Sequence, residues 1–229
     1  MKSSHISILV ILMLAFTAAH HRIVSAQAFK AEIIGGFNKS QVDGDETAGF
    51  KKYGLNTGLG VVLPIYKNWS LSLETLYNQK GSRLRKQFND SLDGSYRLIM
   101  NYAEVPFMIQ YTDRDFMTVS AGVSWGRLVH VEEWKNGYRV DSVTLLNGPF
   151  SRDNFDVFGD FSFRIYQNFK INLRYSYSIK KLTTRTVRDS MSGMMNERDF
   201  YHNLWSLRLI YVLNESRKSI RTPNATQQK

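Results

Sequence analysis

The feature that most constrains the fold of this chain is an alternation of apolar and polar residues with a period of two. It is clearest in FKINLRYSYSIKK, residues 169–181, where the odd-numbered positions from Phe169 to Ile179 are apolar or aromatic and the positions between them, Lys170 to Ser178, are polar. Successive side chains of a strand point to opposite faces, so the pattern predicts a strand with one apolar and one polar face. A soluble sheet and a membrane barrel both fit this pattern, and the rest of the chain has to decide between them.

The same alternation recurs after residue 27, where helical periodicity is nearly absent. We predict about eight strands, near residues 28–39, 53–65, 68–82, 96–112, 115–131, 153–166, 169–181 and 200–213. Several of them are long enough to cross a bilayer, which takes roughly 9–11 tilted residues.

The connections between these strands are more informative than the strands. Tight turns are expected at 66–67, 113–114 and 167–168, whereas the connections at 40–52, 83–95, 132–152 and 182–199 are long and polar. A strict alternation of short and long connections is typical of an outer-membrane barrel with short periplasmic turns and long external loops. We therefore predict an all-β fold, a closed antiparallel transmembrane β-barrel.

Aromatic residues support this prediction, because amphipathic rings prefer the two membrane interfaces. One group falls near the turns: Tyr66, Trp69, Tyr111, Phe116, Tyr166, Phe169 and Tyr211. A second group falls near the opposite strand ends: Phe37, Tyr53, Tyr77, Tyr96, Trp125, Phe155, Tyr177 and Tyr201. Two girdles of this kind are expected of a barrel.

The N-terminus predicts export. Residues 1–26 combine Lys2, an apolar core and the small-residue pattern Val24-Ser25-Ala26, which together indicate a cleaved secretory signal peptide. The apolar core is shorter than the roughly 20 residues of a spanning helix. We expect a barrel domain over 27–213 and a basic polar periplasmic tail over 214–229, and place the protein in the outer membrane of a Gram-negative bacterium.

Composition excludes some chemistry and favours certain partners. The chain has no Cys, which removes disulfides, thiolate metal sites and cysteine nucleophiles. Lys and Arg total 30 against 20 Asp and Glu, a net charge of +10. For an exported chain this favours lipid head groups or lipopolysaccharide phosphates over nucleic acid. No metal-ligand cluster or nucleotide motif occurs, so we expect no cofactor and no metal site.

Charged residues at inward positions are candidates for filling the barrel. They are Glu74, Glu104, Asp156, Asp160, Arg164, Arg174 and Arg208. An interior of eight strands is narrow, and buried charges must be paired, so we expect ion pairs there and no conducting pore. Acid–base catalysis by the pairs Glu74 with Glu104 and Asp156 with Asp160 is the less favoured alternative.

The long connections carry the other candidates. Contacts to lipopolysaccharide or a partner are expected from Arg83, Arg85, Lys86, Lys180, Lys181, Arg185 and Arg188, with a merely solvated loop as the alternative. His130, near Glu132 and Glu133, and His202, after Asp199, could serve as loop-borne general bases. A structural role for both is favoured.

Several segments also resemble a known family. Gly36-Phe37-Asn38, the stretch from Glu74 to Ser82, Asn101-Tyr102-Ala103-Glu104-Val105-Pro106-Phe107 and Ala121-Gly122-Val123 are similar to the PorT-like outer-membrane β-barrel family of the Bacteroidetes. The resemblance implies an architecture more than an activity, and links the chain to a family that includes a barrel of the type IX secretion machinery.

The leading hypothesis is a non-enzymatic outer-membrane barrel that acts as an anchor or interaction partner, in type IX secretion or envelope integrity. Its partners would be outer-membrane lipid and lipopolysaccharide, and a secretion-machinery or periplasmic protein. One rival is an outer-membrane hydrolase or acyltransferase that uses a loop histidine. Another is a soluble periplasmic barrel that binds an apolar ligand, which would require apolar faces inside and charged faces outside.

Overall fold

The computed structural model describes residues 29–45, 49–84, 95–145, 148–188 and 195–213. They form ten strands: β1 (Lys30–Asp43), β2 (Lys52–Tyr66), β3 (Trp69–Leu84), β4 (Tyr96–Asp113), β5 (Met117–Lys135), β6 (Tyr138–Arg139), β7 (Asp153–Tyr166), β8 (Phe169–Ser178), β9 (Thr183–Arg188) and β10 (Met195–Val212). No helix within these ranges is long and apolar enough to cross a membrane.

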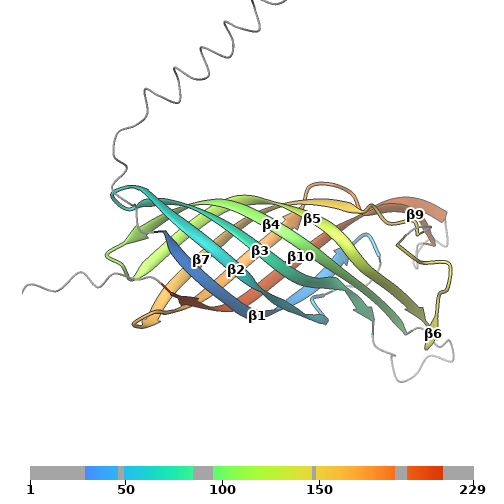
Figure 1. The fold of residues 1–229 in the computed structure, drawn as a ribbon. Helices are drawn as coiled ribbons and strands as arrows, with labels where there is room; N and C mark the ends of the chain where they lie inside the picture. Colours follow the sequence, from blue (N-terminus) through green and yellow to red (C-terminus); the bar gives the residue numbers. More distant parts are fainter. Residues whose placement is uncertain (1–28, 46–48, 85–94, 146–147, 189–194, 214–229) are drawn as a thin grey trace, which may run out of the picture.

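Eight of the strands close into a ring. Every pair is antiparallel, in the order β1-β2-β3-β4-β5-β7-β8-β10, and β10 returns to pair with β1 from Glu32↔Val212 to Asp43↔Tyr201. Figure 1 shows the resulting cylinder of tilted strands, with β6 and β9 at one end. The predicted fold class is confirmed.

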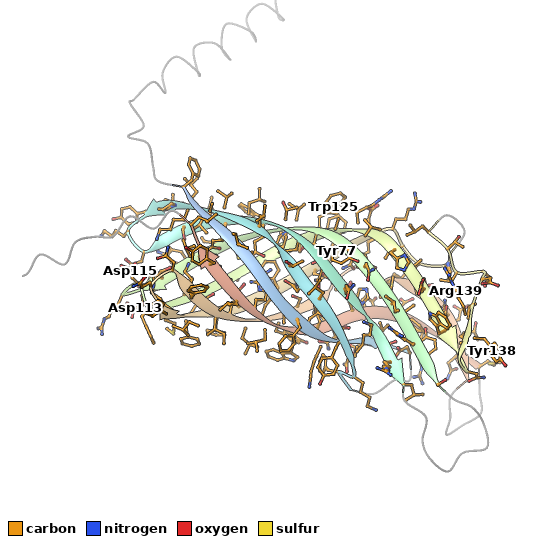
Figure 2. All side chains as sticks on the ribbon, turned by 60° about the horizontal axis from the view of Figure 1, so that its bottom comes forward. Tyr77, Asp113, Asp115, Trp125, Tyr138 and Arg139 are labelled. Carbon is orange, nitrogen blue, oxygen red and sulfur yellow. The ribbon has the colours of Figure 1, made fainter. Side chains whose placement is uncertain are left out.

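Tight turns gather at one end of the cylinder, which we call the turn end. Lys67, Arg114, Asp115 and Gln167 adopt positive φ there, the backbone that a two- to four-residue reversal requires. The opposite end, with the long connections, β6 and β9, is called the loop end. Figure 2 shows Asp113 and Asp115 at the turn end, and Tyr138 and Arg139 at the loop end.

The two faces of each strand differ in the way that the alternation predicted. In β8, Ile171, Leu173 and Tyr175 are exposed, while Asn172 and Arg174 between them are buried. Large apolar side chains are exposed on the outer surface of every barrel strand, and polar side chains dominate the buried set. Figure 2 shows Tyr77 and Trp125 projecting outward from the wall. The soluble-barrel alternative needs the reverse arrangement, so the structure excludes it.

Two backbone positions show how closely the strands approach. A Cβ on Gly122 of β5 would lie 2.2 Å from the carbonyl oxygen of Phe107 on β4, so only glycine fits. Pro106 of β4 pairs with Ser124 of β5, but the β3–β4 pairing is interrupted beside it. Because proline has no N–H to donate, its unpaired side faces β3.

The strands at the loop end differ most from the prediction. β5 runs to Lys135 and β10 begins at Met195, so both extend beyond the ranges 115–131 and 200–213. Two short strands were not predicted: β6, which pairs with β5, and β9, which pairs with β10. Beyond the apolar band the outward residues become polar, so the alternation that identifies a strand disappears although the backbone pairing continues.

Candidate functional site

A cluster of four charged side chains crosses the barrel interior, and we call it the lower charge cluster. It consists of Glu74 from β3, Asp160 from β7, Arg174 from β8 and Arg208 from β10. Each is at an inward position of its strand, and each is almost completely buried.

In the lower charge cluster, each of the two arginines contacts both carboxylates. Arg174 donates from Nη1 to Glu74 Oε2 at 2.9 Å and from Nη2 to Asp160 Oδ2 at 2.7 Å. Arg208 donates to the same two carboxylates at 2.9 and 3.3 Å. Its Nε donates to Asn172 Oδ1 at 2.8 Å. Two cations therefore neutralise two carboxylates, as burial of charge requires.

A second group, the upper charge cluster, lies nearer the loop end. Lys80 of β3 contacts Glu104 of β4, with an Nζ–Oε1 distance of 2.6 Å, and Asp156 of β7. Asn78 donates to Glu104, and Asn154 donates to Asp156. One ammonium group therefore holds two carboxylates together across the barrel.

The structure regroups the interior residues that the sequence predicted. Glu74 lies with Asp160, and Glu104 lies with Asp156, so the carboxylates combine differently from the pairs of the less favoured acid–base alternative. Lys80 was missed, although it follows Glu74 at an even spacing on β3 and the alternation places it inward.

Arg164 does not join either cluster. Its Nε and Nη1 donate to the backbone carbonyl oxygens of Asp115 and Gln167, at 2.8 and 2.9 Å. It sits only two residues from the end of β7, where the register shifts between Arg164 and Tyr166, so its long side chain reaches the turns. Arg164 therefore lies at the turn end, and its expected interior ion pair stays a prediction.

The turn end contains a polar hollow. A cavity of about 200 Å³ is lined there by Lys30, Lys67, Arg114, Arg164 and Lys170, with Asp115 among the other lining residues. Lys170 donates to Glu32 at 3.0 Å. Positive charge therefore predominates at this mouth of the barrel.

An apolar core closes the loop end from inside. It comprises Val42, Leu98, Met100, Tyr102, Leu128, Val131, Val143, Phe150, Leu182 and Phe200. Val143 and Phe150 belong to the connection between β6 and β7, which folds back over the barrel. Backbone hydrogen bonds fix this segment: Leu128 N–H donates to Arg152 at 2.7 Å, and Ser151 N–H donates to Leu182 at 2.7 Å. We call the ensemble the apolar cap.

A partly buried ion pair borders the apolar cap. Arg185 of β9 donates from Nη1 and Nη2 to the two oxygens of Glu133 at 2.8 and 2.9 Å, and its guanidinium lies 4.8 Å from the ring of Phe150. Burial alone would raise the pKa of Glu133, but the hydrogen bonds and charge of Arg185, with Lys135 nearby, hold that pKa below its usual value. Arg185 therefore stabilises the cap, and its expected contact to lipopolysaccharide or a partner stays a prediction.

The other predicted loop cations have different surroundings. Arg83, Lys180 and Lys181 are exposed, and Lys181 forms an ion pair with Asp199 at 3.3 Å. Arg85 and Lys86 lie outside the described residues, as does the side chain of Arg188, whose backbone ends β9.

The two histidines lie on opposite sides of the barrel wall. His130 is about half-exposed, with Nε2 3.4 Å from Glu132 Oε1. His202 is completely buried, with Nε2 3.3 Å from the hydroxyl of Tyr102. Asp199 is bound to Thr184 and Lys181 instead of His202. Within the described residues, no group of three or more His, Cys, Asp or Glu could hold a metal ion.

A family comparison agrees with this geometry. The sequence model named "Outer membrane protein beta-barrel domain" matches residues 25–184, which is more than half of the chain. The chain belongs to this family. It is accordingly an outer-membrane protein.

Solved structures of other barrels are similar in fold. Ail of Yersinia pestis, solved in complex with the heparin analogue sucrose octasulfate, is 14% identical with a TM-score of 0.46, over 81% of this chain and 99% of that one. Neisserial surface protein A is 10% identical with a TM-score of 0.42, over 80% and 96%. The protease OmpT of Escherichia coli is 9% identical with a TM-score of 0.34, over 81% and 95%. A search of curated proteins finds no significant match.

Proposed function

We propose that this protein is a non-enzymatic, non-conducting outer-membrane barrel that serves as an anchor or interaction partner. The observation that carries the proposal is the filled interior. The lower charge cluster spans the cross-section of the barrel, and the apolar cap closes the loop end above it. Side chains therefore occupy the space that a channel or an internal active site would need.

The proposal includes the route and setting of the protein. A cleaved signal peptide over 1–26 would export it in a Gram-negative bacterium, and the polar tail over 214–229 would lie in the periplasm. The resemblance to PorT-like barrels of the Bacteroidetes suggests type IX secretion or envelope integrity as the process it serves. The basic turn-end hollow supports a periplasmic partner, because five cationic side chains line it.

The catalytic alternative has weak support. His202 cannot reach solvent substrate from its buried position, and His130 has a carboxylate neighbour but lies on the outer wall. The carboxylates of both charge clusters are held by cations instead of facing an open cavity.

Two measurements test the proposal. The tagged protein, with the tag on the 214–229 tail, should bring down stoichiometric secretion-machinery or periplasmic proteins from gently solubilised native outer membranes. Purified protein in planar bilayers should show no stable conductance. Steady channel openings would contradict the filled interior, and recovery of a monomeric barrel with lipopolysaccharide alone would contradict a protein partner.

A further inference from the structure

Two arginines stand directly opposite each other on the outer wall at the loop end. Arg83 of β3 and Arg97 of β4 are cross-strand partners, and both side chains are exposed. Like charges directly opposite on neighbouring strands destabilise a sheet. Among the residues that the structure describes, no carboxylate forms an ion pair with either guanidinium. Within the described residues the pair is therefore repulsive, and a bound anion would relieve that repulsion.

A third cation adds to the positive charge. Lys52, the first residue of β2, is buried at an inward position of its strand, and its Nζ donates to the carbonyl oxygen of Tyr53 at 2.6 Å. Burial, and then the charges of Arg97 and Arg83, lower the pKa of Lys52. The three positive groups are therefore close enough to act on one another.

The surface is hollowed at the two arginines. A cavity of about 320 Å³ is lined by Arg83, Leu84, Ser95, Tyr96, Arg97, Trp134 and Gly137. Trp134 of β5 is the cross-strand partner of Arg97. The nearest outward carboxylate on β5, Glu132, accepts from the Trp134 indole and also lies beside His130 and Arg139. An aromatic surface and two guanidinium groups thus share one concave site, and the described acid that touches it, Glu132, is held by Trp134, His130 and Arg139.

The location of this site narrows the range of ligands that it could bind. Arg83 follows Tyr77 on the outward face of β3 and lies closer to the loop end, where the outward positions Gln79 and Gly81 no longer carry large apolar side chains. This is the layer in which the sugars and phosphates of the outer leaflet lie. Guanidinium groups bind phosphate in a bidentate geometry, and an indole ring packs well against the apolar face of a sugar.

We propose that Arg83 and Arg97, with Trp134 beside them, bind a phosphate group carried on a saccharide of the lipopolysaccharide core. The proposal rests on the proposed function, whose anchoring role it makes specific. The barrel would be held by one defined phosphosugar, in addition to the general attraction between a basic chain and an anionic surface.

Titration of the detergent-solubilised full barrel with deacylated lipopolysaccharide core oligosaccharide tests the site. Isothermal calorimetry should show binding of the phosphorylated oligosaccharide, and phosphatase treatment should weaken it at least about tenfold. R83Q and R97Q should each weaken binding of the phosphorylated form about tenfold, the scale of one charge-assisted contact. The control variant K39Q/R127Q removes the same charge as R83Q/R97Q from other exposed positions of the outer wall and should bind like wild type.

A measurement of folding stability distinguishes a binding role of the two arginines from a structural one. R83Q should unfold at the same or a higher urea concentration than wild type, because it removes a repulsion. Equal binding by wild type and R83Q/R97Q would overturn the proposal, as would an equal loss in K39Q/R127Q. Binding of glucose 6-phosphate without binding of the core oligosaccharide would overturn lipopolysaccharide as the source. None of these outcomes depends on the conductance or pull-down results that test the proposed function.

Discussion

Replacing Glu74 by Gln is the sharpest test of the lower charge cluster. Glu74 accepts three hydrogen bonds from guanidinium groups: two from Arg174, at 2.9 and 3.1 Å, and one from Arg208, at 2.9 Å. Gln keeps the volume but removes the negative charge and turns an N–H toward a cation. Two buried cations would then share Asp160 alone. Removing one partner of a buried ion pair costs about 3–5 kcal/mol, and we expect a loss of unfolding free energy in that range.

The measurement is reversible urea unfolding of the barrel in phospholipid vesicles, followed by tryptophan fluorescence. The double variant E74Q/R208M restores the charge balance and leaves the Arg174–Asp160 pair intact, so it should recover more than about half of the loss. Asp153→Asn, which removes the exposed partner of Arg127, is the matched control and should leave the unfolding midpoint unchanged. A loss below about 1 kcal/mol for E74Q would refute the reasoning, because that is the scale of a solvated pair.

Three further predictions concern other parts of the barrel. Lys80→Met leaves two buried carboxylates without their cation and should cost about 3–5 kcal/mol in urea unfolding at neutral pH. The loss should shrink as acid protonates them. The pKa of Glu133 is lowered in the folded protein, so its bond to Arg185 stabilises the cap fully when the pH is above the ordinary carboxyl pKa of 4.5. This stabilisation is lost as the pH falls through the folded-state pKa. Limited proteolysis at the loop end should therefore accelerate in acid. Gly122→Ala should cost about 1–3 kcal/mol in the same unfolding assay, because the new Cβ meets the Phe107 carbonyl oxygen.

The barrel wall was predictable because a strict physical rule governs it. A strand between lipid and a packed interior must alternate, and FKINLRYSYSIKK does so from Phe169 onward; β8 begins at that residue. The requirement for alternation no longer applies beyond the edge of the membrane. Strand β9 and the extension of β5 to Lys135 depend on backbone pairing and on the folded-back segment around Phe150, and these leave no period-two signal in the sequence.

The sequence predicted which charged residues face the barrel interior, but not which of them form ion pairs with one another. Alternation places Glu74, Arg174 and Arg208 inside, and the structure brings them together. Which carboxylate meets which cation depends on the stagger of strands that are far apart in sequence. Alternation along one strand carries no information on stagger, which explains both the altered grouping and the turn-end position of Arg164. The ion pair of Arg185 was missed for a similar reason, since its acceptor, Glu133, lies on another strand.

The closing pair of strands has a consequence for the order of assembly. β1 meets β10, and these segments stand at opposite ends of the barrel sequence. Until β10 arrives, β1 and β8 each present a row of backbone groups that hydrocarbon cannot satisfy. Arg208, which completes the neutralisation of Glu74 and Asp160, also arrives on β10. Closure of the barrel wall and neutralisation of the interior charge therefore occur in the same late step of assembly. The first strand of a nascent barrel must be shielded from lipid until the last strand is in place.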